Sequence, residues 1–206
     1  MTAILKHSSF AIKNMKNQKL IDKLHEMPHC KKEMKFLFSE QFLSVDYLKG
    51  QTIIGPNLFN NSLYFVNNGL LRRYPLRLGL AGTSQLFIIG DFITQNGIYL
   101  KRPSLEYIEC LSQVELLTIN HKQLERFFRQ QPEAIKLLLC ILEEQKLKEI
   151  ENAEMMRLEP AIERYRFASV VLGKLIHDLP KRILSSYLRI SEKQLSRLLI
   201  EYAHGK

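Results

Sequence analysis

Residues 180–206 have the sequence PKRILSSYLRISEKQLSRLLIEYAHGK, and this stretch decides the fold of the C-terminal part. Pro180 suits the first turn of a helix, where its missing N–H has no partner to lose, and it predicts a helix over 181–188. Ser191 is typical of a helix N-cap, because its hydroxyl can accept from a free backbone N–H, and it predicts a second helix over 192–203. Two short helices joined by a tight turn predict a helix-turn-helix.

The apolar side chains of this stretch fall where such a unit needs its small core. The residues expected in that core are Leu184, Leu188, Ile190, Leu195 and Leu198. Ser185 lies on the inner face and is small enough for the helices to approach closely. Two amphipathic helices with a solvated polar face would show the same spacing, so the spacing alone leaves both alternatives open.

The opposite face carries side chains suited to DNA. Arg197 could donate two hydrogen bonds to a guanine edge, and Glu192 could accept from a cytosine amino group. Lys193 could reach bases or phosphates, and phosphate contacts are expected at the start of the first helix. The predicted DNA-facing residues are Lys181, Arg182, Arg189, Ser191, Glu192, Lys193, Ser196 and Arg197.

The composition favours a polyanionic partner and a reducing compartment. The 206 residues include 30 Lys and Arg against 21 Asp and Glu, a net charge of +9. This balance favours nucleic acid, although membrane surfaces and acidic proteins are also polyanions. Cys30, Cys110 and Cys140 are odd in number and widely spaced, so no disulfide framework is expected. With no secretory pattern and no run of roughly 20 apolar residues, the protein is expected in the cytoplasm without a membrane partner.

Residues 42–119 have the pattern of an antiparallel β domain. Seven of the nine glycines lie there, between short aromatic and aliphatic runs. The runs 63–66 and 70–74 flank Asn-Asn-Gly, which predicts a hairpin because Asn and Gly tolerate positive φ. Residues 107–119 predict two further strands. Many short strands at regular spacing predict a barrel or jelly roll.

The remaining segments have helical patterns, with short helices expected within 1–40, over 122–128 and over 161–176. Residues 133–157 contain neither Gly nor Pro. A helix of about 25 residues would span roughly 40 Å, which is too long to bury against one small β domain. We therefore predict a connector that packs against a second copy of itself. The stripe expected at that contact is Ile135, Leu138, Leu139, Leu142 and Ile150. The alternative is an ordinary core helix broken near residues 143–144.

Several motifs resemble the Crp/Fnr family of bacterial transcription regulators, in particular its short members. They are Glu163-Arg164-Tyr165, the run 179–197 with Leu195-Ser196-Arg197, and the stretches YFVNNGLLR at 64–72, GDFI at 90–93 and YIECL at 107–111. The resemblance covers about residues 18–203 and is most specific at the C-terminus.

The resemblance implies an α+β fold in three parts. These are a cyclic-nucleotide-binding-like antiparallel β-roll or jelly roll with N-terminal helices over 1–128, a dimerisation helix over 129–158, and an all-α helix-turn-helix domain over 159–206. It also implies a homodimer on double-stranded DNA, with RNA polymerase as a further partner. The family usually has Gly in the turn where Arg189 stands, and a non-Gly residue in a left-handed turn costs about 1 kcal/mol. The chain stops soon after the second helix, so the β-wing of larger members is expected to be missing or rudimentary.

Members that bind cyclic nucleotides hold the ribose with a Gly-Glu pair and the phosphate with an Arg. Alignment on 90–93 places Thr94 and Gln95 at the Gly-Glu positions, and alignment on 107–108 places Ser104 near the Arg position. Both charged groups are absent, so control by cyclic AMP through that mechanism is not expected. Any surviving pocket, for an unknown effector or none, is predicted to be lined by Thr94, Gln95, Tyr99, Arg102 and Ser104.

No catalytic residue, metal site or cofactor is predicted. His25 and His29 have the spacing of a metal pair, but a surface stretch around Pro28 is favoured. A cupin-type enzyme would need a histidine cluster in its strands, and residues 42–119 contain no histidine. The sequence therefore predicts a DNA-binding transcription regulator rather than an enzyme. The alternative is a small-molecule sensor or partner-binding module whose degenerate helix-turn-helix does not read DNA.

Overall fold

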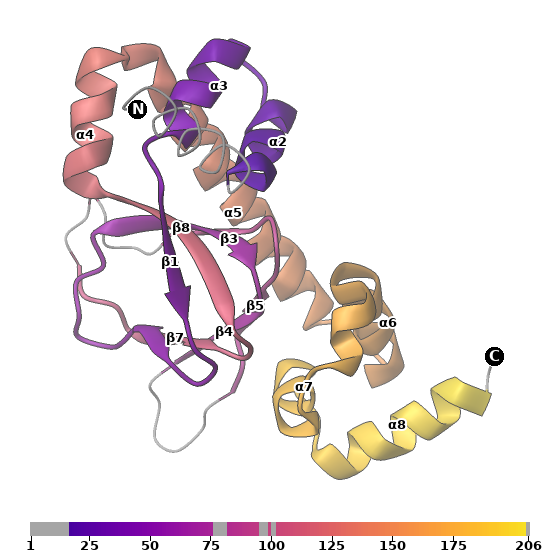
Figure 1. The fold of residues 1–206 in the computed structure, drawn as a ribbon. Coiled ribbons are helices and arrows are strands. Elements are labelled where there is room, and N and C mark those ends of the chain that lie inside the picture. Colours follow the sequence, from indigo (N-terminus) through magenta and orange to yellow (C-terminus); the bar gives the residue numbers. More distant parts are fainter. Residues whose placement is uncertain (1–16, 76–81, 95–98, 100–101, 205–206) are drawn as a thin grey trace, which may run out of the picture.

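Two antiparallel sheets face each other in the N-terminal half of the chain (Figure 1). The computed structural model describes residues 17–75, 82–94, 99 and 102–204. One sheet has the strand order β1-β8-β3-β6 and the other β2-β7-β4-β5. The strands are β1 (Leu43–Tyr47), β2 (Thr52–Ile54), β3 (Ser62–Asn68), β4 (Leu71–Pro75), β5 (Gln85–Phe87), β6 (Phe92–Ile93), β7 (Glu106–Cys110) and β8 (Val114–Asn120). The prediction of an α+β fold with an antiparallel jelly roll is confirmed.

An apolar core fills the space between the sheets. It joins side chains from both sheets, because alternate residues of each strand point inward. Its largest members include Phe87, Ile93, Ile108 and Leu116, each fully buried. This core fixes how the two sheets are placed, and with them the loops at the ends of the roll.

The predicted hairpin at residues 63–74 is wrong. β3 pairs with β8 and β6, whereas β4 pairs with β7 and β5, so the chain crosses from one sheet to the other at Gly69. Gly69 has φ +101°, and a Cβ there would lie 2.5 Å from the backbone oxygen of Gln113. The glycine is needed because a second crossover, between β7 and β8, lies against the first.

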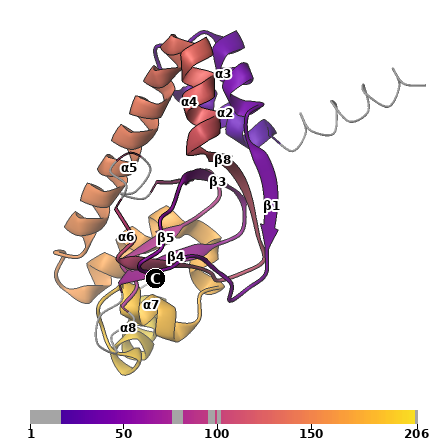
Figure 2. The same ribbon diagram turned by 90° about the vertical axis from the view of Figure 1, so that its left-hand side faces the viewer.

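Helices cover one sheet and extend beyond it. The helices α2 (Gln18–Glu26), α3 (Lys32–Ser39) and α4 (His121–Gln130) contribute to a second core with the first half of α5 (Ile135–Met155). Figure 2 shows α5 along one side of the roll and β1 on the other. The chain then continues into α6 (Ala161–Leu172), α7 (Lys181–Tyr187) and α8 (Glu192–His204) at the opposite end from α3 and α4.

Candidate nucleic-acid interface

The C-terminal unit contains the two short helices that the sequence predicts. The predicted helix 181–188 is α7, Lys181–Tyr187, and the predicted helix 192–203 is α8, Glu192–His204. The expected helix over 161–176 is divided into α6 and a 3-10 turn, Gly173–His177. The turn between α7 and α8 leaves α8 projecting from the body of the molecule (Figure 1).

A small apolar core holds α7 and α8 on α6. Leu188 and Leu195 are fully buried, and Leu184 and Leu198 are nearly so. Ile190 is half-buried and packs against the same cluster. Leu172, Ile176 and Tyr165 complete the core from the α6 side, where the Tyr165 ring meets the Tyr202 ring edge-on at 5.1 Å. All five predicted core residues therefore belong to the apolar cluster that packs α8 against α6 and α7.

At residue 189 the turn adopts the left-handed conformation that the resemblance implies, although Arg189 stands in place of the usual Gly. Arg189 has φ +53°, and the backbone N–H of Ile190 donates to the Ser185 carbonyl at 3.0 Å. Ser185 is only 4% exposed, so its small side chain allows this close approach. The turn keeps its shape without glycine, and the Arg189 side chain is exposed beside it.

A capping box begins α8. The Gln194 N–H donates to the Ser191 hydroxyl at 3.1 Å, and the Ser191 N–H donates to the Gln194 side-chain oxygen at 2.8 Å. These bonds satisfy two backbone donors that the helix itself leaves free. Ser191 was predicted as the cap, while Gln194 was missed although Ser-x-x-Gln is the sequence signature of a capping box.

The outer face of α8 is polar and accessible. Glu192, Lys193 and Arg197 are exposed, with Lys193 and Arg197 one turn apart. Ser196 is half-buried, and its hydroxyl donates to the Glu192 carbonyl at 3.0 Å within the helix. Lys181 and Arg182 are exposed at the start of α7. The structure thus brings cationic side chains from α7, the turn and α8 to the surface of one compact unit.

Two contacts fix this unit against the rest of the chain. Met155, in the last turn of α5, is fully buried in the core of the C-terminal unit. The Ser186 hydroxyl of α7 donates to the Thr83 hydroxyl, just before β5, at 2.8 Å. Burial, with a smaller contribution from the Asp91 carboxylate, raises the pKa of Tyr187 to about 12. Both α5 and the roll therefore determine where α8 lies.

The outer face of α5 carries an exposed apolar stripe. Ile135, Leu139, Leu142 and Ile150 are between 41% and 52% exposed. Leu138 does not belong to this stripe. It is 3% exposed and packs in the core that α5 shares with α2, α3 and α4. Its predicted place on the outward face is corrected, because it lies toward the side of α5 that the roll covers.

Solved structures with this arrangement span nearly the same length. CLP, the c-di-GMP responsive global regulator of Xanthomonas campestris, has a TM-score of 0.66 and 16% identity over 85% of this chain and 93% of its own. FixK2 from Bradyrhizobium japonicum has a TM-score of 0.62 and 18% identity over 80% and 86%. A cyclic nucleotide-binding domain containing protein from Listeria monocytogenes EGD-e has a TM-score of 0.62 and 16% identity over 92% and 91%.

This chain has the fold of the Crp/Fnr-type regulators. No family model matches its sequence, and no curated protein is similar to it in sequence, so the likeness is one of fold.

The pocket predicted over residues 94–104 is described in part. Gln95 lies outside the described residues, and Thr94 beside it is half-buried. Ser104 is buried, and its hydroxyl accepts from the Glu106 N–H and donates to the Glu106 carbonyl. Arg102 is exposed, and the ring of Tyr99 lies 4.9 Å from that of His121. The Ser104 hydroxyl therefore holds the backbone where β7 begins.

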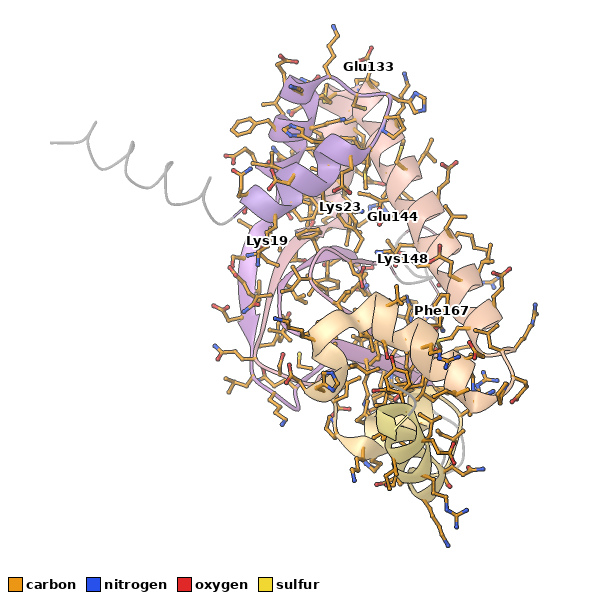
Figure 3. The ribbon with its side chains drawn as sticks, turned by 90° about the vertical axis from the view of Figure 1, so that its right-hand side faces the viewer. Lys19, Lys23, Glu133, Glu144, Lys148 and Phe167 are labelled. Atoms are coloured by element: carbon orange, nitrogen blue, oxygen red, sulfur yellow. The ribbon has the colours of Figure 1, made fainter. Side chains whose placement is uncertain are left out.

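A line of paired charges joins α2, α5 and the roll (Figure 3). The Lys23 ammonium lies 2.8 Å from the Glu144 carboxylate, and Lys148 pairs with both Glu144 and Asp91. Asp91 also accepts from the Ile88 N–H. Burial alone would lower the pKa of Lys148, but the Asp91 and Glu144 carboxylates outweigh it and raise that pKa. These partly buried charged groups form ion pairs with one another within the chain.

The described part of the chain contains no group of three or more His, Cys, Asp or Glu side chains placed to hold a metal ion. None of its helices is both long enough and apolar enough to span a membrane.

Proposed function

We propose that this protein is a homodimeric transcription regulator of the Crp/Fnr type that binds double-stranded DNA in the cytoplasm. The observation that carries the proposal is that α8 has one buried apolar face and one exposed cationic face. Its inner face is locked by Leu195 and Leu198, while Lys193 and Arg197 on its outer face are exposed. A supported helix with accessible cationic and polar residues in its first two turns is what major-groove recognition requires.

Residues around α8 have distinct proposed roles. Arg197 and Glu192 read base edges, and Lys193 reaches bases or phosphates. The residues proposed to hold the DNA backbone or complete this surface are Lys181, Arg182, Arg189, Ser191 and Ser196. RNA polymerase is the proposed further partner, as expected for a regulator of this fold.

The DNA-binding proposal is tested by selecting bound duplexes from a random pool with the purified full chain. Enrichment of a two-fold symmetric site, with half-sites about 34 Å apart and binding that weakens steeply with salt, is the expected result. Failure to enrich any sequence, with only weak salt-dependent binding to all duplexes, would sink the proposal. That outcome would favour a sensor or partner-binding module whose helix-turn-helix does not read DNA.

The dimer is proposed to form through the outer stripe of α5. We expect sedimentation to give the mass of two chains, because four exposed apolar side chains on one face need a partner surface. Leu139→Glu should release monomers. Leu147→Glu is the matched control, since Leu147 is 61% exposed and lies about 80° around the helix from Leu139. Equal dissociation by both variants, or by neither, would contradict this interface.

Control by cyclic AMP is not part of the proposal. The positions aligned with the ribose and phosphate contacts hold Thr94, Gln95 and Ser104, which supply neither a carboxylate nor a guanidinium. Any other effector is proposed to lie near Tyr99 and Arg102. Calorimetric titration should show no heat of binding at micromolar cyclic AMP, and a saturable signal in that range would overturn this part.

A further inference from the structure

One buried cation connects the end of α5 to the turn before α8. Arg164 lies in the first turn of α6 and is 6% exposed. Its Nε donates to the Leu188 carbonyl at 2.9 Å, and its Nη1 donates to the Leu158 carbonyl at 2.7 Å. The same Nη1 lies 2.8 Å from the Glu159 carboxylate. A single planar guanidinium therefore holds two backbone segments that lie far apart in the sequence.

Both backbone segments matter for the placement of α8. Leu158 follows α5, which ends at Met155, and Leu188 is the C-cap of α7 and precedes the left-handed Arg189. The Leu188 carbonyl, at the C-terminus of α7, has no partner within its helix and carries the negative end of the helix dipole, so a cation binds it well. The Glu159 side chain is 76% exposed, so the buried Arg164 guanidinium has one carboxylate partner at the surface.

We propose that Arg164 is the positioning residue that sets the angle between the dimerisation helix α5 and the recognition helix α8. Met155 provides the apolar part of this joint, because it inserts into the core beneath α8. Apolar packing resists separation but is not directional. The forked guanidinium adds direction, because its hydrogen bonds fix the orientation of two carbonyls at once. The proposal rests on the proposed DNA-binding dimer.

The angle between α5 and α8 has a consequence for DNA. In a two-fold dimer it sets the distance and relative rotation of the two recognition helices. Adding one base pair between half-sites shifts one of them by about 3.4 Å and rotates it by roughly 35°. If the angle between α5 and α8 is rigid, the dimer binds weakly to sites with altered half-site spacing. If the angle can vary, the dimer tolerates such sites.

The test measures affinity for the selected site and for versions with one or two base pairs inserted or removed between the half-sites. The wild type is expected to lose about tenfold or more in affinity for a change of one base pair, and Arg164→Lys about threefold or less. Lysine keeps the charge but cannot serve both carbonyls through a planar fork. The matched control is Arg166→Lys, because Arg166 lies on the same helix and its guanidinium pairs at the surface with the Glu163 carboxylate at 2.6 Å.

The outcomes separate this inference from the proposed function. A wild type that binds no duplex selectively overturns the proposed function itself. A wild type with a spacing preference that Arg164→Lys retains, whatever happens to its melting temperature, overturns the role of Arg164. The same is true if Arg166→Lys flattens the preference equally. Should Arg164→Lys fail to fold, Arg164→Gln is used instead, because its short amide can donate to only one of the two carbonyls. A flatter profile then supports the proposal, and an unchanged one overturns it.

Discussion

The α8 surface and the junction between α5 and the roll use charged side chains in opposite ways. On α8, Lys193 and Arg197 are exposed above a fully formed apolar core. At the junction, Lys148 lies between Asp91 and Glu144, and Glu144 also holds Lys23. Charges of the first kind are available to an external polyanion. Charges of the second kind stabilise the protein that carries them, so substitutions in the two regions should change different measurements.

The largest effect is expected from Arg197→Ala. If Arg197 makes two hydrogen bonds to a base edge, its loss should weaken binding to the selected site by about 1–3 kcal/mol, measured by fluorescence anisotropy. The free energy of unfolding should change by no more than about 0.5 kcal/mol, because the side chain is exposed.

Arg166→Ala is the control for Arg197→Ala, because it removes an exposed arginine of the same domain that pairs with Glu163. It should leave DNA affinity close to that of the wild type. Equal binding by all three proteins would show that α8 does not present this face to DNA, and the contrast between the two regions would be lost.

Lys148→Met is expected to lower the free energy of unfolding, which Arg197→Ala should leave almost unchanged. It leaves the Asp91 carboxylate, which is 8% exposed, without its ammonium partner. The free energy of unfolding should fall by about 1–2 kcal/mol, a discounted value because the Lys148 side chain is one-third exposed. Denaturant unfolding measures this loss.

Lys146→Met is the matched control for Lys148→Met, since Lys146 lies on the same helix and is exposed. Its unfolding should be unchanged. A Lys148→Met protein as stable as the wild type would mean that the junction charges contribute little, and that packing alone holds α5 on the roll.

Local chemistry explains why both ends of α7 and of α8 could be predicted within one residue. Pro180 and Ser191 act on the backbone next to them, so their effect is visible in the sequence. The crossover at Gly69 could not be distinguished from a hairpin, because the choice depends on Val114 and its neighbours, which lie far along the chain. The burial of Leu138 was missed for a related reason, since the helical pattern of α5 does not say which side the roll covers.

The bridging role of Arg164 had no local signal at all. Its family motif is visible in the sequence, but its acceptors are the carbonyls of Leu158 and Leu188, which any residue type provides. Contacts from a side chain to a distant backbone follow from the assembled fold rather than from spacing. The same holds for the pairing of Lys148 with Asp91, which are separated by more than fifty positions.

The smallest expected effect is that of Arg189→Gly, which separates the shape of the turn from its charge. Arg189 has φ +53°, a conformation that costs a non-Gly residue about 1 kcal/mol. Glycine removes this strain but increases the entropy of the unfolded chain, so the free energy of unfolding should rise by only about 0.5 kcal/mol. The slope of log affinity against log salt should become less steep by about one if the lost charge had neutralised a phosphate.

Arg189→Lys is the control for Arg189→Gly. It keeps both the backbone strain and the charge, so it should match the wild type in both measurements. A glycine variant that unfolds more easily would contradict this expectation. It would mean that the Arg189 side chain stabilises the turn by more than its backbone strain costs. Arg189 would then be a structural charge, like those at the α5 junction, rather than an exposed charge of the α8 surface.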